Sequence, residues 1–131
     1  MKRQDAMFVA MCVGSIVFSI VFVLPHFMSL SVPWYFPVER RWEFGPKPTP
    51  GGIAMDFYGR FAEALVAWGV AVAVSLVATK RMKTEQVPPK VASLLVAWAI
   101  ALAVLVMMYY AWTLAFRVPN AAPIPDWYIP R

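Results

Sequence analysis

Three long runs of apolar residues constrain the fold of this chain more than any other feature of its sequence. Residues 6–24 and 91–116 carry no charged side chain, and residues 61–79 carry only Glu63. A helix needs roughly 18 or more predominantly apolar residues to cross a bilayer, and each run is that long. The chain is therefore predicted to be an all-α membrane protein with three transmembrane helices. Flanking prolines and glycines set their expected limits at residues 6–32, 54–79 and 91–116.

The composition supports this interpretation and argues against other classes of protein. Of the 131 residues, 61% are hydrophobic and 15% are charged, so the chain is more apolar than an ordinary soluble domain. The net charge of +5 does not indicate nucleic-acid binding, because no basic stripe interleaved with exposed aromatic residues lies outside the membrane boundaries. The sequence contains no glycine-rich phosphate loop, no metal-ligand spacing and no nucleophile with a nearby base. We therefore expect no metal site, no intrinsic cofactor and no catalysis by this chain alone.

Basic residues indicate how the chain is oriented in the membrane. The short loop 80–90 is rich in lysine and arginine and lies directly at the ends of two helices. Because basic residues concentrate in short cytoplasmic loops, we expect the N-terminus in the cytoplasm and the C-terminus outside. The first apolar run exceeds the roughly 7–15 residues of a signal-peptide core, so we interpret it as a retained anchor. Residues 1–131 then form a single multi-pass domain of a bacterial inner membrane, with an inner loop at 80–90, an outer loop at 33–53 and an outer tail at 117–131.

The outer loop and the outer tail share a composition rich in proline and aromatic residues. Such segments are predicted to be extended, and they are too short to form a soluble domain of their own. Amphipathic aromatic rings favour the headgroup region of a membrane. We therefore expect these segments to lie on the membrane surface or against a neighbouring protein. The predicted interface aromatics are Trp34, Tyr35, Trp42, Trp127 and Tyr128.

Three charged residues, Asp56, Arg60 and Glu63, lie near the start of the second predicted helix. Their spacing of four and three residues places them on one helix face. Ionisable residues at membrane depth are candidates for a ligand or proton site. The alternative is a structural charge cluster, in which Asp56 caps the helix or complements its positive N-terminal dipole, and Arg60 pairs with both acids. We favour the structural cluster, because two acids flanking one arginine satisfy each other locally.

His26, Tyr109 and Tyr110 are expected at the same depth as this cluster, near the outer interface. Counting 1.5 Å per residue from the inner helix ends places all of them at about 24 to 30 Å. They form a second possible ligand-binding group. Because His26 is the sole histidine, a haem with two imidazole ligands would need a second ligand from a partner. Copper binding through Cys12 and the nearby methionines is a weaker alternative, since sulfur residues in membrane helices mostly serve packing.

Small residues recur at helical spacing on all three predicted helices. This pattern lets helix backbones approach closely within lipid. Three helices offer little interior, so we expect part of this surface to face another subunit. The predicted seams contain Ala10 and Gly14 in the first helix, Ala67, Ala71, Ser75 and Ala78 in the second, and Ser93, Ala97 and Ala101 in the third.

In size, helix number and deduced orientation, the chain resembles small accessory subunits of terminal oxidases and the three-helix membrane anchors of succinate dehydrogenase. The resemblance is architectural and covers no diagnostic motif. Those anchors ligate haem through a histidine and bind quinone through a serine and an arginine at other places in their pattern, whereas His26 lies on the first helix. The resemblance implies a redox or electron-transfer assembly, with haem or quinone at a subunit interface.

We therefore expect a non-catalytic accessory or structural subunit of a multi-subunit complex in a bacterial inner membrane. Its expected partners are the other membrane subunits and bound lipid, and not nucleic acid. The alternative is a small oligomeric transporter, or a haem- or quinone-site membrane anchor. In that case Glu63 with Arg60, or His26, would be the working group.

Overall fold

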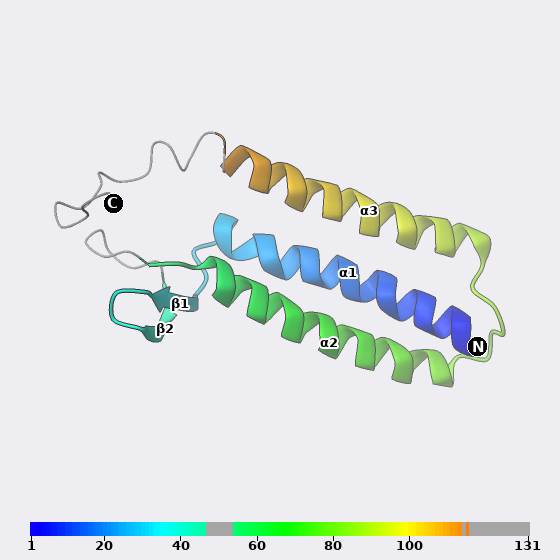
Figure 1. The fold of residues 1–131 in the computed structure, drawn as a ribbon. Coiled ribbons are helices and arrows are strands. Elements are labelled where there is room, and N and C mark those ends of the chain that lie inside the picture. Colours follow the sequence, from blue (N-terminus) through cyan, green and yellow to red (C-terminus); the bar gives the residue numbers. More distant parts are fainter. Residues whose placement is uncertain (47–53, 114, 116–131) are drawn as a thin grey trace.

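Three long helices make up most of the structure. The computed structural model describes residues 1–46, 54–113 and 115. Each helix is long and apolar enough to cross a membrane, by length and composition. Figure 1 shows α1 between α2 and α3, and α1 packs against both neighbours, more extensively against α2. The helices are α1 (Arg3–Phe27), α2 (Phe57–Arg81) and α3 (Pro89–Trp112).

The helix limits differ from the predicted ones by a few residues, for local reasons. The first helix ends at Phe27 rather than at residue 32, because Pro25 lacks a backbone N–H and the chain soon turns into a strand. The second begins at Phe57 rather than at residue 54, because the backbone of Met55 is bonded to another segment. The third begins at Pro89 rather than at residue 91, since proline fits the first position of a helix.

The outer loop was expected to be extended, and the prediction of an all-α chain is wrong here because the segment folds into a β-hairpin. Strand β1 (Val32–Phe36) pairs in antiparallel register with β2 (Arg41–Gly45), from Val32 opposite Gly45 to Phe36 opposite Arg41. A turn of residues 37–40 joins the strands, with Arg40 in the left-handed region at φ 52°. Two aromatic five-residue runs separated by four residues were the signal for this hairpin. The prolines and the absence of glycine in the turn obscured it.

The hairpin is attached to the start of α2. Tyr35 and Met55 exchange two backbone hydrogen bonds of 2.9 and 2.8 Å, which add a single bridge on the free edge of β1. One turn later, Gly59 is buried directly beneath the backbone of Pro33. A β-carbon at Gly59 would lie 2.7 Å from the carbonyl carbon of Pro33, and closer still to its oxygen. Glycine therefore permits this contact between strand and helix.

Helices α1 and α2 pack through the small-residue seam of α1. Ala10 and Gly14 are both buried, as the predicted seam of the first helix requires. A β-carbon at Gly14 would lie 2.8 Å from the ring of Trp68 and 2.8 Å from a methyl group of Val72. The facing side of α2 contains Trp68 and Val72, next to the half-buried Ala67, Ala71 and Ser75 of the predicted stripe, whereas Ala78 is exposed. A large aromatic ring on α2 fills the space above a small residue on α1.

At the opposite end of the bundle, the N-terminus contacts the loop between α2 and α3. The backbone N–H of Lys2 donates to the carbonyl oxygen of Glu85 at 3.0 Å. We call the other end, where α1 and α3 finish and α2 begins beside β1 and β2, the hairpin end (Figure 1). The predicted outer tail 117–131 lies outside the described residues, as do residues 47–53 of the outer loop.

Candidate functional site

Arg60 is the buried cation at the hairpin end. Its side chain is only 8% exposed, and its guanidinium carbon lies 5.5 Å from the ring centroid of Phe22 on α1. Such a cation-over-ring arrangement is favourable, because the face of an aromatic ring is electronegative. Helix α2 positions the side chain by placing Arg60, Ala64 and Trp68 on the face that meets α1.

Asp56 is the counter-ion of Arg60, one helical turn earlier. Asp56 Oδ2 lies 3.2 Å from Arg60 Nε, close enough for an ion pair. The N–H group does not point at this oxygen, so Nε and Nη1 are both buried without a hydrogen-bond acceptor. We regard the contact as a Coulombic pair that leaves the donors of the guanidinium unsatisfied. Asp56 is at the N-cap position of α2, but the predicted capping hydrogen bond is absent, because the side chain turns to Arg60 instead.

Glu63 does not join this pair. Among the residues that the structure describes, Arg60 has an ion pair with Asp56, and none connects it to Glu63. Glu63 and Ala64 are adjacent in sequence and so lie about 100° apart around α2. Glu63 remains on the same side of α2 as Arg60, about 60° around the helix from it and away from the fully buried Ala64, and it is half-buried. The expectation that Glu63 shares Arg60 is therefore not met by the structure.

An aromatic layer lies beside the Arg60 guanidinium, which is over the Phe22 ring. The rings of Phe22 and Tyr110 stack with centroids 5.6 Å apart, and Phe57 meets each of them edge-on at 6.0 and 5.6 Å. One turn along α1, Phe18 stacks on Phe22 at 5.8 Å. All three helices contribute to this layer, so it fixes their relative positions at the hairpin end.

His26 and the two tyrosines lie at the same end, as the depth estimate predicts. The ring centroids of His26 and Tyr109 are 4.7 Å apart. Tyr110 stacks on Phe22, and the Arg60 guanidinium lies over that same Phe22 ring. The structure thus brings His26 and Tyr109 into direct contact and places Tyr110 beside the guanidinium. Within the described ranges, histidine, cysteine, aspartate and glutamate do not gather in a group of three that could hold a metal ion.

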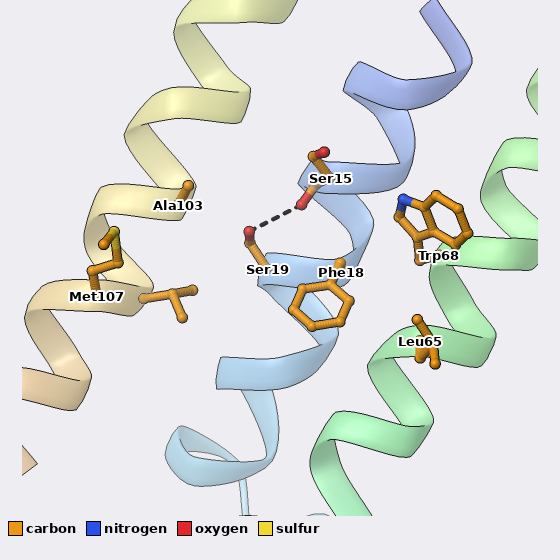
Figure 2. Close-up of a pocket in the computed structure, with 8 residues that line it drawn as sticks. Ser15, Phe18, Ser19, Leu65, Trp68, Ala103 and Met107 are labelled. Atoms are coloured by element: carbon orange, nitrogen blue, oxygen red, sulfur yellow. Dashed lines mark hydrogen bonds between the residues drawn. The ribbon is translucent and has the colours of Figure 1, made fainter. Parts of the chain in front are cut away.

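An apolar groove opens one turn deeper in the bundle than the aromatic layer. Figure 2 shows side chains of α2 and α3 facing each other across α1. The groove has a volume of about 470 Å³. The hydroxyl of Ser19 donates to the carbonyl oxygen of Ser15 at 2.9 Å, so it is already satisfied within its own helix. The lining residues are Ser15, Phe18, Ser19, Leu65, Trp68, Ala103, Val106 and Met107.

No family model, curated protein or solved structure matches this chain. The candidate site is therefore defined by its own geometry, which consists of a buried arginine, an aromatic layer and an adjoining groove.

Three of the predicted interface aromatics lie on the hairpin. Tyr35 and Trp42 are opposite each other across the strands, with ring centroids 5.0 Å apart. The indole N–H of Trp34 donates to the carbonyl oxygen of Gly45 at 3.1 Å, while Trp42 is more than half exposed. Trp127 and Tyr128, the other two, lie outside the described residues. The hairpin thus presents an aromatic surface beside the helix ends.

Sequence reasoning missed two residues of the site. The ring of Phe22 lies beneath the Arg60 guanidinium. Thr113, in the turn after α3, has a buried hydroxyl oxygen without a hydrogen-bond partner. A signal for Phe22 was available, because Phe18 and Phe22 are one turn apart on α1 at the depth of Arg60. No comparable signal marked Thr113, since its burial depends on how α3 packs.

Proposed function

We propose that this chain is a non-catalytic accessory subunit of a multi-subunit membrane complex and joins its partners through α3. One observation carries the proposal. None of the 24 residues of α3 is buried, and its small residues Ser93, Ala97 and Ala101 are all exposed. The corresponding seam of α1, by contrast, is used within the chain, because Ala10 and Gly14 are buried.

A lipid-facing helix has no need of small residues, because large apolar side chains are as compatible with lipid tails as small ones are. Small residues instead favour close contact with another helix. The residues of α3 that face α1 are the half-buried ones, including Ala92, Ala99 and Val106. Ala97 and Val106 are nine residues apart, or about 2.5 turns, and therefore lie on opposite sides of α3. The small-residue face is thus directed away from the bundle, where it is accessible to a partner helix.

The host complex that we propose is a redox or electron-transfer assembly of a bacterial inner membrane. The support is the architectural resemblance to three-helix anchors and oxidase accessory subunits. A visible absorption spectrum of the purified complex addresses the redox part of the proposal, because haem absorbs strongly in the visible range. Subunit identities from the same preparation address the host.

An Ala97→Trp substitution is expected to separate the chain from its partners without unfolding it. The indole would hold a neighbouring helix away from α3, whereas it makes no contact with α1 or α2. Recovery of partner subunits with the tagged chain in mild detergent should fall by at least about tenfold, which corresponds to about 1.4 kcal/mol of association free energy.

Val91→Trp is the matched control, because Val91 is exposed on α3 but lies about 120° around the helix from Ala97. It should leave the partners in place. If the wild-type chain is recovered as a lone monodisperse species, or if the two variants retain partners equally, the proposal is wrong.

A second candidate function, a small oligomeric transporter, is favoured by one specific observation. Glu63 lies within a membrane-length helix, and among the described residues it has no ion-pair partner. A carboxylate in that position is costly unless it serves transport or meets a partner chain.

A Glu63→Gln substitution distinguishes the two functions. Under the transporter function, flux through vesicles containing the chain is expected to disappear while the oligomer remains intact. Under the accessory-subunit function, the complex should lose partner subunits instead. Glu85→Gln, in the loop after α2, is the control and should change neither flux nor assembly.

A further inference from the structure

The Arg60 guanidinium lacks acceptors that a buried cation requires. Nε faces Asp56 without a hydrogen bond, and Nη1 has no acceptor at all. A buried charged donor without an acceptor retains the full cost of its desolvation. The aromatic layer beside it cannot remove this cost, because ring faces attract the charge but do not replace hydrogen-bond acceptors. The site therefore calls for a ligand with acceptor oxygens.

A second, independent observation lies at the C-terminal end of α3. The hydroxyl oxygen of Thr113 is the remaining buried side-chain polar atom without a partner in the described part of the chain. Thr113 follows Tyr110 by three residues, so it is at the hairpin end too, about 4.5 Å further along the helix direction. Unsatisfied groups at the start of α2 and just after α3 thus occur at the same end of the bundle. Arginine can only donate and threonine can also donate, so the matching ligand is an acceptor, preferably an anion.

The apolar groove adjoins the aromatic layer and lies deeper in the bundle. Phe18 lines the groove and stacks on Phe22, over which the guanidinium lies. On α3, Val106 lines the groove one turn before Tyr110. On α2, Leu65 and Trp68 are five and eight residues beyond Arg60, or about 7.5 and 12 Å along the axis. These depths fall within half of a roughly 30 Å hydrocarbon core, which is the reach of one acyl chain.

We propose that a phospholipid occupies this site, with its phosphate at Arg60 and one acyl chain along the groove. The phosphodiester accepts hydrogen bonds from Arg60 Nη1 and from the Thr113 hydroxyl, and a guanidinium suits phosphate geometry well. Apart from Ser15 and Ser19, the side chains that line the groove are apolar, as a hydrocarbon chain requires. The buried cation requires an anion, so a lipid with a phosphate headgroup and a hydrocarbon chain matches both parts of the site. The proposal does not rest on the accessory-subunit function, since the small-residue face of α3 is on the other side of that helix.

The test measures phospholipid that remains bound after extensive washing in detergent. The full chain is purified from membranes, washed, and analysed by native mass spectrometry and by phosphorus content. A phospholipid should remain on the wild-type chain. Arg60→Gln removes the guanidinium that donates hydrogen bonds to the phosphate. Ala103→Phe fills the groove without touching Arg60. Each is expected to reduce retained phospholipid by at least about tenfold, which corresponds to about 1.4 kcal/mol of binding free energy.

Matched controls separate this effect from a general loss of charge or shape. Arg81→Gln removes a cation from the other end of α2, and Leu105→Phe enlarges an exposed residue of α3 that does not line the groove. Both should retain the lipid. If Arg60→Gln fails to fold, the phospholipid retained by Ala103→Phe alone decides whether the proposal holds. Circular dichroism then verifies that this variant keeps its helical content. The proposal is overturned if the wild-type chain retains no phospholipid, if Ala103→Phe retains it fully, or if inorganic phosphate or a partner polypeptide is retained instead.

Discussion

A Gly59→Ala substitution is expected to destabilise the protein, although the same change in most helices is stabilising. The added β-carbon would lie 2.7 Å from the carbonyl carbon and 2.9 Å from the β-carbon of Pro33. The obstructing atoms belong largely to the backbone of β1, which is held by its pairing with β2 and Met55 and cannot rotate away. Overpacking of this kind costs about 1–3 kcal/mol. We expect the free energy of unfolding to fall by that amount, measured by thermal or denaturant unfolding in detergent.

Gly69 provides the control on the same helix. A β-carbon there has no atom within 4 Å, so Gly69→Ala should raise the free energy of unfolding by about 0.5–1 kcal/mol through helix propensity alone. The two substitutions are chemically identical and are expected to act in opposite directions. Equal stabilisation by both would show that the hairpin does not rest on α2 as described.

Removal of the Asp56 carboxylate is expected to have the second large effect. Asp56→Asn would leave the Arg60 guanidinium buried without its counter-ion. Breaking a fully buried ion pair costs about 3–5 kcal/mol, but the Asp56 side chain is 34% exposed. We therefore expect a smaller loss of about 1–3 kcal/mol, the range for an unsatisfied buried polar group. Unfolding in detergent, monitored by circular dichroism, measures this loss.

Two comparisons make this prediction specific. Glu39→Gln removes an acid from the exposed ion pair with Arg41 and should change stability by less than about 0.5 kcal/mol. Arg60→Met added to Asp56→Asn should restore most of the lost stability, because the uncompensated charge is then gone. If Asp56→Asn is as harmless as Glu39→Gln, the Asp56–Arg60 pair has no structural role.

The three long apolar helices were predictable because their signal is local. An uncharged run such as residues 91–116 leaves few alternatives to a helix that satisfies its own backbone hydrogen bonds within lipid. Helix ends were less certain, since they depend on what the next segment does. The end of α1 at Phe27 reflects the proximity of β1, and the start of α2 at Phe57 reflects the hydrogen bonds of Met55 with Tyr35.

The charge cluster was predicted in part. The spacing of Asp56 and Arg60 by four residues indicated their pairing, and the structure contains it. The same reasoning assigned Glu63 to Arg60, because residues three apart also lie close on a helix. It failed there because the direction of the arginine side chain is decided by Phe22 on α1, a contact outside α2. Local spacing restricts the possible partners of a side chain, and neighbouring elements select among them.

The sequence by itself determined that this chain forms three long apolar helices, because hydrophobicity and helical spacing act over short stretches. Only the tertiary structure decided that the proline- and aromatic-rich segment folds as a hairpin on Gly59, and that Arg60 lies over Phe22. It also decided that the small-residue seam of α1 is buried within the chain, whereas the seam of α3 is exposed. These features depend on contacts between residues far apart in the chain, and no local pattern specifies which of several compatible faces will meet.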